Sequence, residues 1–215
     1  MFVAAAIAGA LLYGQHCASC HGADLRGSVN APSIRGAGAA QVDFWVGTGR
    51  MPAALPWVEE GHRRTPFTRE QIDALIAYVT SVQPGGAAIP VVLLGGDPRR
   101  GRTLFEQNCE HCHGAYAQGA SIGSSEWAPS LRDASRVQLA EAVRIGPGQM
   151  PPFGEQQLGG RDLDDVAAYV ESLDAGADRP LVPLTSSGPV PEGLLGWLAV
   201  GLLIVFAFGY SRSSR

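Results

Sequence analysis

The spacing of hydrophobic and polar positions predicts a mainly helical protein. After Thr68, apolar residues recur at i, i+3, i+4 and i+7, the spacing of one helical face: Ile72, Leu75, Ile76 and Val79. Gln71 follows Thr68 at capping-box spacing, so this helix is expected to begin there. A second face of this kind is formed by Leu163, Val166, Val170 and Leu173. Shorter helices are expected over about 39–46 and 135–144, and no convincing strand pattern is present.

The last apolar stretch has a different pattern. Gly193–Tyr210 carries no charge over eighteen residues, which as a helix is roughly 27 Å long, close to a bilayer core. Arg212 and Arg215 follow it, and basic residues favour the cytoplasmic side of a membrane. We therefore predict one C-terminal transmembrane helix over 192–210 in the plasma membrane, with a cytoplasmic tail at 211–215 and the preceding domains outside. A buried core helix is the alternative.

Two parts of the chain are related by an internal repeat. Gly9–Ala23 aligns with Gly101–Ala115 at an offset of 92 residues without a gap. Three more blocks align in the same order: Ala31–Arg35 with Ala128–Arg132, Val46–Pro52 with Ile145–Pro151, and Ile72–Val79 with Leu163–Val170. Four ordered blocks indicate a duplication. We expect two domains, 1–88 and 95–175, followed by a Pro/Gly/Ser-rich linker over 176–191.

Each repeat contains the motif Cys-x-x-Cys-His, the attachment signature of c-type haem. The motif residues are Cys17, Cys20 and His21 in the first repeat, and Cys109, Cys112 and His113 in the second. Each thiol adds to a haem vinyl group as a thioether, and the histidine is aimed at the iron. The pattern predicts two covalently bound haem c groups. A four-cysteine zinc site, redox dithiols and structural disulfides are alternatives, but they leave the duplicated His and Met unexplained.

Met51 and Met150 occupy the same place in their repeats, each within Gly-x-Gly-x-Met-Pro. A thioether sulfur is a soft neutral ligand that raises the haem potential, so these residues are the predicted sixth ligands of the two irons. Packing in the core is the alternative role for both. An iron with both axial positions filled favours electron transfer, and we expect no independent catalytic site.

Composition narrows the function further. The net charge is −4 and the 16 basic residues are all arginine, so the basic face of a nucleic-acid-binding protein is not expected. Gly and Pro, 28 and 15 residues, are frequent enough to place many turns between short helices.

These residues resemble two tandem class I cytochrome c domains. The resemblance implies that the carbonyls of Pro32 and Pro129 orient the ligand histidines. It also implies aromatic contacts between the first and last helix of each domain, Tyr13 with Tyr78 and Phe105 with Tyr169. Arg35 and Arg132 are matched between the repeats, and they are either partners of the haem propionates or plain surface charge.

The domain order and tail resemble the dihaem cytochrome c subunit of the actinobacterial menaquinol–cytochrome c reductase, a cytochrome bc complex. That resemblance implies a membrane-bound redox subunit of a proton-translocating oxidoreductase. Its partners would be the cytochrome b subunit, the Rieske iron–sulfur subunit and the dicopper subunit of an aa-type oxidase. The alternatives are a membrane-anchored dihaem shuttle and a haem subunit of another respiratory oxidase or dehydrogenase.

The beginning of the chain departs from this family, which carries a membrane segment before the first haem domain. Met1–Leu12 is apolar, but as a helix it is about 18 Å long, too short to span a bilayer. Since haem attachment requires export, we expect upstream codons to encode an export signal or a first span. The alternative is that the C-terminal span alone directs insertion.

Overall fold

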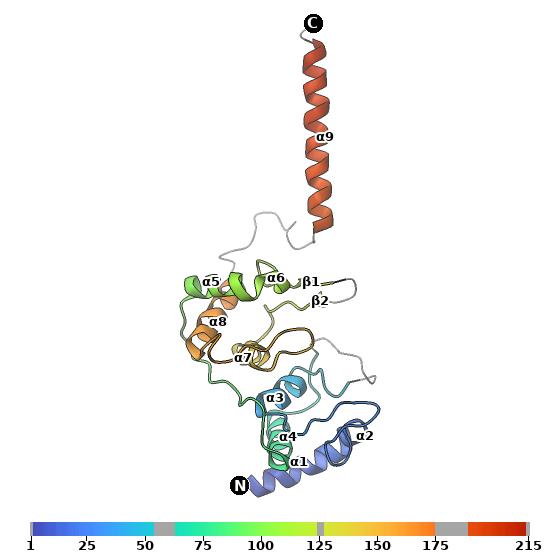
Figure 1. Cartoon of the computed structure of the whole chain (residues 1–215), viewed down its shortest axis with the longest axis vertical. Helices are drawn as coiled ribbons and strands as arrows, with labels where there is room; N and C mark the ends of the chain where they lie inside the picture. The colour runs from blue at the N-terminus through green and yellow to red at the C-terminus, as the bar shows by residue number, and fades with distance from the viewer. Residues whose placement is uncertain (1, 54–62, 124–126, 175–188, 214–215) are drawn as a thin grey trace. The chain divides into compact units, whose positions relative to one another are not determined.

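The computed structural model describes residues 2–53, 63–123, 127–174 and 189–213 and is mainly helical, as predicted (Figure 1). The helices are α1 Phe2–His16, α2 Ala18–His21, α3 Ala39–Gly47, α4 Arg69–Val82, α5 Pro98–Asn108, α6 Glu110–His113, α7 Arg136–Ile145, α8 Gly160–Asp174 and α9 Pro189–Ser213. Two short strands, β1 Ala120–Ser121 and β2 Trp127–Ala128, form an antiparallel pair. The sequence analysis missed these strands because two residues are too few to show an alternating pattern.

The chain divides into two compact units. Unit 1 consists of Met1–Phe105 with Asp133–Tyr169, and unit 2 of Glu106–Arg132 with Val170–Arg215. The predicted domain boundaries, 1–88 and 95–175, stay a prediction. The predicted linker over 176–191 falls largely outside the described residues, as does the end of the predicted tail.

Helix α1 packs closely on α4 because Gly9 has no side chain. A Cβ atom at Gly9 would overlap the carbonyl oxygen of Ala74 and press on Cβ of Tyr78. Beyond this contact, the rings of Tyr13 and Tyr78 meet with centroids 5.3 Å apart, as the resemblance implied. The contact places the end of α1, and therefore the first cysteine pair, against a core that includes Leu75 and Val79.

The second repeat uses the same device. A Cβ atom at Gly101 of α5 would overlap the carbonyl oxygen of Asp165 in α8. The rings of Phe105 and Tyr169 then meet with centroids 5.4 Å apart, which confirms the second aromatic contact. A glycine one helical turn before a buried aromatic residue thus sets the approach of the first and last helices in both repeats.

Two capping boxes fix where the helices of the repeats begin. Thr68 accepts a hydrogen bond from the backbone N–H of Gln71, whose side chain accepts one from the N–H of Thr68, as predicted. Ser135 and Gln138 form the same box at the start of α7. Helix α7 ends at Gly146 in the left-handed conformation, which turns the chain into the loop that carries Met150.

The C-terminal prediction needs correction. Among the helices that the structure describes, none is both long enough and apolar enough to cross a membrane. The predicted transmembrane helix over 192–210 is therefore wrong for the described residues. The plasma-membrane placement, with a cytoplasmic C-terminus and external domains, loses its support with it.

Candidate functional site

Each cysteine pair lies on a single helical turn. In the first repeat, the N–H groups of Cys20 and His21 donate to the carbonyl of Cys17 at 3.1 and 2.9 Å. In the second repeat, Cys112 and His113 donate to Cys109 at the same two distances. The backbone angles also agree, with φ and ψ of −123° and −35° at Cys17 and −123° and −36° at Cys109. The sequence motif therefore folds into the same local geometry twice, with both thiols and the histidine on one turn.

The histidine rings are held by proline carbonyls. Nδ1 of His21 lies 2.9 Å from the carbonyl oxygen of Pro32, and Nδ1 of His113 lies 2.9 Å from that of Pro129. A carbonyl only accepts, so Nδ1 carries the hydrogen and Nε2 keeps the lone pair that a metal binds. Burial lowers the pKa of His113, which the bond to Pro129 opposes, so the ring is in its neutral, metal-binding form. The role that the resemblance implied for both prolines is confirmed in geometry.

The cysteines fit covalent attachment. All four are free thiols. Burial, with a smaller contribution from the neighbouring cysteine, raises the pKa of Cys17 and Cys109 to about 11 each. Zinc binding and redox exchange need the thiolate, which these raised pKa values disfavour. Within the described part of the chain, no three His, Cys, Asp or Glu side chains are grouped as they would be to hold a metal ion.

Sequence reasoning missed the residues that close each turn. Leu25 and Ala117 are fully buried and have positive φ angles of 64° and 52°. Their carbonyls accept hydrogen bonds from Ile34 and Leu131 at 2.9 Å each, which brings the proline segment over the histidine. The offset of 92 residues that relates the cysteine motifs also relates Leu25 to Ala117, so extending the alignment by two residues would have found them.

Two matched arginines lie beside these turns. Nε of Arg35 donates to the carbonyl of Asp24 at 2.9 Å, and Nε of Arg132 donates to the carbonyl of Tyr116 at 2.9 Å. Both guanidinium groups are thus anchored through the same nitrogen beside the histidine-bearing loop. We call each set of Cys pair, His, Pro and closing residue a haem cradle: cradle 1 is Cys17–Pro32 and cradle 2 is Cys109–Pro129.

The methionine loops are less alike than the cradles. The N–H of Met51 donates to the carbonyl of Trp45 at 2.8 Å, whereas the N–H of Met150 donates to Pro147 at 3.0 Å. Met150 also packs against a small core that contains Val143 and Leu158. The described contacts of both methionines are with their own loops and neighbouring helices, so their place at the iron stays a prediction.

Tyr13 distinguishes cradle 1 from cradle 2. Its buried hydroxyl donates to the carbonyl of Gly22, the residue after the ligand histidine, at 2.6 Å. Phe105 fills the equivalent place and is fully buried, but it has no hydroxyl. The two cradles therefore share a backbone while differing in one buried hydrogen bond.

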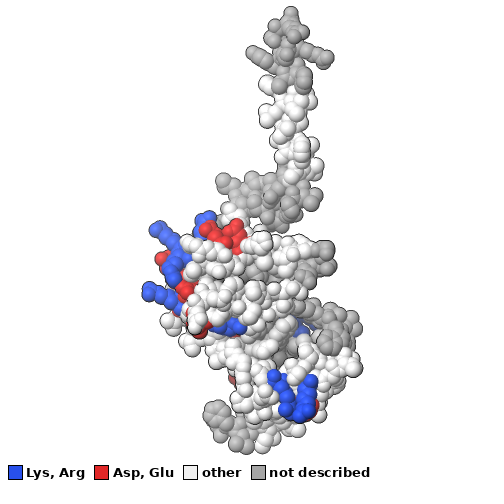
Figure 2. Space-filling view, viewed as in Figure 1, with Lys and Arg blue, Asp and Glu red and all other residues white. Residues whose placement is uncertain are grey.

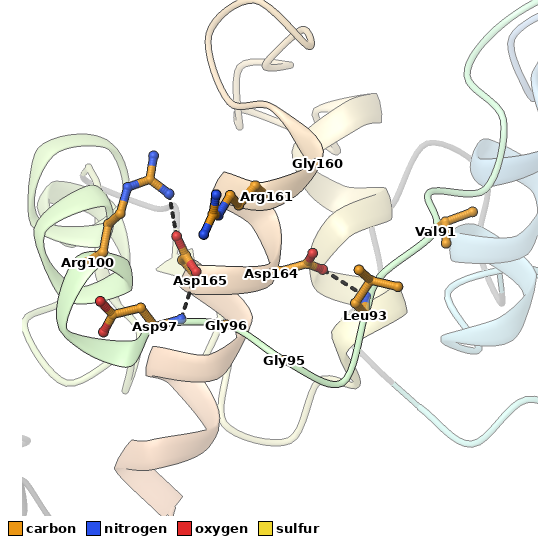
Figure 3. Close-up of a pocket in the computed structure, with 10 residues that line it drawn as sticks. All are labelled: Val91, Leu93, Gly95, Gly96, Asp97, Arg100, Gly160, Arg161, Asp164 and Asp165. Atoms are coloured by element: carbon orange, nitrogen blue, oxygen red, sulfur yellow. Dashed lines mark hydrogen bonds and ion pairs between the residues drawn. The ribbon is translucent and has the colours of Figure 1, made fainter.

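A separate open pocket of about 910 Å³ lies beside α8 (Figure 3). The carboxylates of its two buried acids already accept hydrogen bonds from the backbone. Asp164 accepts from the N–H of Leu93 at 2.8 Å, and Asp165 accepts from the N–H of Asp97 at 2.7 Å. Arg100 pairs with Asp165 and with Asp162. On the face that Figure 2 displays, acidic and basic side chains are interspersed. At this pocket the chain before α5 is hydrogen-bonded to α8.

Comparison with known proteins agrees with two repeats. Residues 6–83 match the model of the family "Cytochrome c", and residues 96–170 match the model "Cytochrome C oxidase, cbb3-type, subunit III". A solved structure, the Kuenenia stuttgartiensis reducing HAO-like protein complex Kustc0457/Kustc0458, is similar at 17% identity over 77% of this chain and 95% of that one. Its TM-score of 0.40 is too low to carry an argument.

Curated relatives match nearly the whole chain. The cytochrome bc1 complex cytochrome c subunit of Mycobacterium tuberculosis H37Rv is 36% identical over 91% of this chain and 75% of its own length. The subunit of that name from Corynebacterium diphtheriae is 33% identical over 95% and 79%. The cbb3-type cytochrome c oxidase subunit CcoP of Azospirillum sp. B510 is 28% identical over 76% and 60%. The chain therefore belongs to the family of cytochrome bc1 complex cytochrome c subunits and is an electron-transfer cytochrome with covalently bound haem c.

Proposed function

We propose that this chain carries two haem c groups and conducts electrons from a Rieske iron–sulfur protein to a terminal oxidase, as the redox subunit of a proton-translocating quinol–cytochrome c reductase. The observation that supports this most strongly is the repetition of one cradle, with equal Cys–His backbone distances and equal His–Pro distances of 2.9 Å. When bound, each haem supplies an iron that gains and loses one electron.

The residues of this chain would hold and tune those groups. Cys17, Cys20, Cys109 and Cys112 would form the thioether bonds. His21 and His113 would bind the irons from one side, oriented by the proline carbonyls. Met51 and Met150 would bind from the other side and raise both potentials. Arg35 and Arg132, already anchored through Nε, would offer their remaining N–H groups to the propionates.

The partners follow from the family. A cytochrome bc1 complex implies a cytochrome b subunit and a Rieske subunit, and we propose the dicopper subunit of an aa-type oxidase as the acceptor. A second candidate is a haem subunit of a cbb3-type oxidase, which the matches to the subunit III model and to CcoP favour. Purifying the tagged native chain separates these proposals: cytochrome b and Rieske subunits in the purified complex support the first, and a cbb3 catalytic subunit supports the second.

The haem and ligand assignments have a direct test. The full chain, matured with haem, should contain two haem c groups and show the near-infrared band of sulfur-to-iron ligation when oxidised. Met51→Ala and Met150→Ala should each remove about half of this band and lower the potential of one haem by on the order of 0.1 V or more. His111→Ala is the matched control, because this exposed side chain lies between the cysteines and is expected to leave both haems unchanged. A full band in either methionine variant would refute that ligand.

A further inference from the structure

Two acidic side chains are buried together where α3 contacts α7 (Figure 1). Asp43 of α3 is 7% exposed and Glu141 of α7 is 1% exposed. A side-chain hydrogen bond with Asp43 is one of the interactions that raise the pKa of Glu141. From α4, Nη1 of Arg69 pairs with Oδ1 of Asp43 at 2.6 Å. Both helices belong to unit 1, and in sequence one comes from each repeat.

The charges around this pair do not balance if both acids are ionised. Arg69 is the cation that faces them, and it is shared with Asp73 of its own helix at 2.6 Å. Arg144, one turn beyond Glu141, is directed to the carbonyl of Phe153 and to Glu155 instead. Among the described residues, Oε1 of Glu141 is buried without a hydrogen-bond partner. An ionised carboxylate with an unpartnered buried oxygen is strongly disfavoured, so the described side chains supply one positive charge too few for both acids to be ionised.

A proton supplies that charge. Burial raises the pKa of Glu141 to about 8, with the negative charge of Asp43 and the hydrogen bond to it acting in the same direction, while Arg69 opposes the shift. Glu141 is therefore mostly neutral at physiological pH, and as a carboxylic acid it can donate a hydrogen bond.

We propose that Glu141 and Asp43 form a proton-binding site in which a single proton, donated by Glu141 to Asp43, fastens α3 to α7. Each of these helices leads into a methionine loop: Met51 donates back to Trp45 of α3, and Phe153 donates back to Val143 of α7. Release of the proton would set two carboxylates against each other and loosen the contact between the helices that carry both loops. This role is separate from haem attachment and does not depend on it.

The proposal predicts how the stability contributed by Glu141 changes with pH. The folded-state pKa of Glu141, about 8, lies above its ordinary value of 4.5. The stability due to this group is therefore fully present below pH 4.5 and is lost as the pH rises through about 8. Between these values the folded chain holds a proton that the unfolded chain releases.

Proton release on unfolding provides the test, using the full haem-loaded chain. At about pH 6.5 the parent should release about one more proton than Glu141→Gln, measured from the pH dependence of the unfolding free energy. Glu155→Gln is the matched control, because Glu155 is exposed and paired with Arg144, and it should behave like the parent. Asp43→Asn removes the neighbouring negative charge and should also reduce the release. Equal proton release from the parent and Glu141→Gln would overturn the proposal.

Hydrogen exchange tests whether the proton holds α3 and α7 together. At about pH 9, where the parent is ionised at Glu141, amides of α3 and α7 should exchange faster in the parent than in Glu141→Gln. At about pH 6 the two proteins should match, and α8 serves as an internal reference at both values. Comparison at one pH removes the intrinsic dependence of exchange on pH. Identical exchange of α3 and α7 in both proteins at the higher pH would show that the proton does not join these helices.

Discussion

Cradles 1 and 2 have nearly the same backbone but different surroundings. The Cys–His hydrogen bonds, the His–Pro distance and the positive φ at the closing residue recur in both. Tyr13 supports the first cradle with a hydrogen-bonded hydroxyl, whereas Phe105, the aligned residue of the second repeat, has no hydroxyl. His113 is also buried, while His21 is partly exposed. The comparison teaches that main-chain hydrogen bonds define the geometry of both cradles, whereas the surrounding side chains are free to differ.

The methionine loops differ between the repeats more than the cradles do. In the first repeat the ligand candidate itself bonds back to the preceding helix, through Trp45. In the second, Phe153 makes the return bond, to Val143, and Met150 bonds within its own loop. A loop that presents one sulfur atom has fewer geometric requirements than a turn that presents two thiols and a histidine. The loops have therefore diverged further than the cradles.

The largest expected effect comes from adding a methyl group at Gly9 and Gly101, the glycines that both repeats share. We expect Gly9→Ala and Gly101→Ala each to destabilise the folded chain by about 3 kcal/mol, because the new Cβ overlaps a carbonyl oxygen of the facing helix. Denaturant unfolding of the haem-loaded protein measures both. Gly14→Ala is the control, since no atom lies near its Cβ position, and it should stabilise by roughly 0.5–1 kcal/mol. Similar effects of Gly9→Ala and Gly14→Ala would mean that α1 and α4 are not closely packed.

A second difference lies on the last helices, where Asp165 of the second repeat aligns with Ala74 of the first. Burial opposes ionisation of Asp165, but the hydrogen bonds from the N–H of Asp97 and from Arg100 outweigh it and lower its pKa. Asp165→Asn should therefore cost about 2 kcal/mol near neutral pH, as measured by denaturant unfolding.

The pH dependence of this effect has a definite sign. Because the folded pKa lies below the ordinary value of 3.8, the contribution of Asp165 is present above that value and is lost as the pH falls through the folded pKa. The difference between the parent and Asp165→Asn should shrink in strong acid. Asp73→Asn, at a carboxylate that is 61% exposed, should cost less than about 1 kcal/mol and serves as the control in the first repeat. A cost at Asp165 no larger than at Asp73 would contradict the prediction.

The smallest expected effects concern Tyr13 and Phe105, the aligned aromatic residues of the two repeats. Tyr13→Phe removes the donor to Gly22 and should cost about 1 kcal/mol, since the Gly22 carbonyl keeps its bond from Leu25. Phe105→Tyr should be tolerated within about 1 kcal/mol, because the aligned position in the first repeat already accommodates a buried tyrosine. Thermal unfolding of both variants checks this. A large loss in Phe105→Tyr alone would show that the space behind the two cradles differs more than their backbones.

Several predictions from the sequence agree with the structure for identifiable reasons. The capping box at Thr68 and the helices around residues 39–46 and 135–144 depend on spacing within one repeat, whereas both aromatic contacts were implied by the family resemblance. The prediction of a membrane span was wrong for the described residues, because no helix among them is both long and apolar enough to cross a membrane. The strands β1 and β2, and the closing residues Leu25 and Ala117, were missed because neither has a periodic signal.

By itself, the sequence determined the local geometry of the two cysteine motifs and predicted their attachment chemistry. Two thiols and a histidine within five residues fold onto one helical turn, and an ordered repeat shows that this happens twice. The tertiary structure alone decided which buried ring carries a hydroxyl bond, and that Asp43 and Glu141 are buried together. The physical reason is distance along the chain: local hydrogen bonds are set by spacing, whereas contacts between distant segments depend on how helices pack, and a buried carboxyl pair leaves no pattern in the sequence.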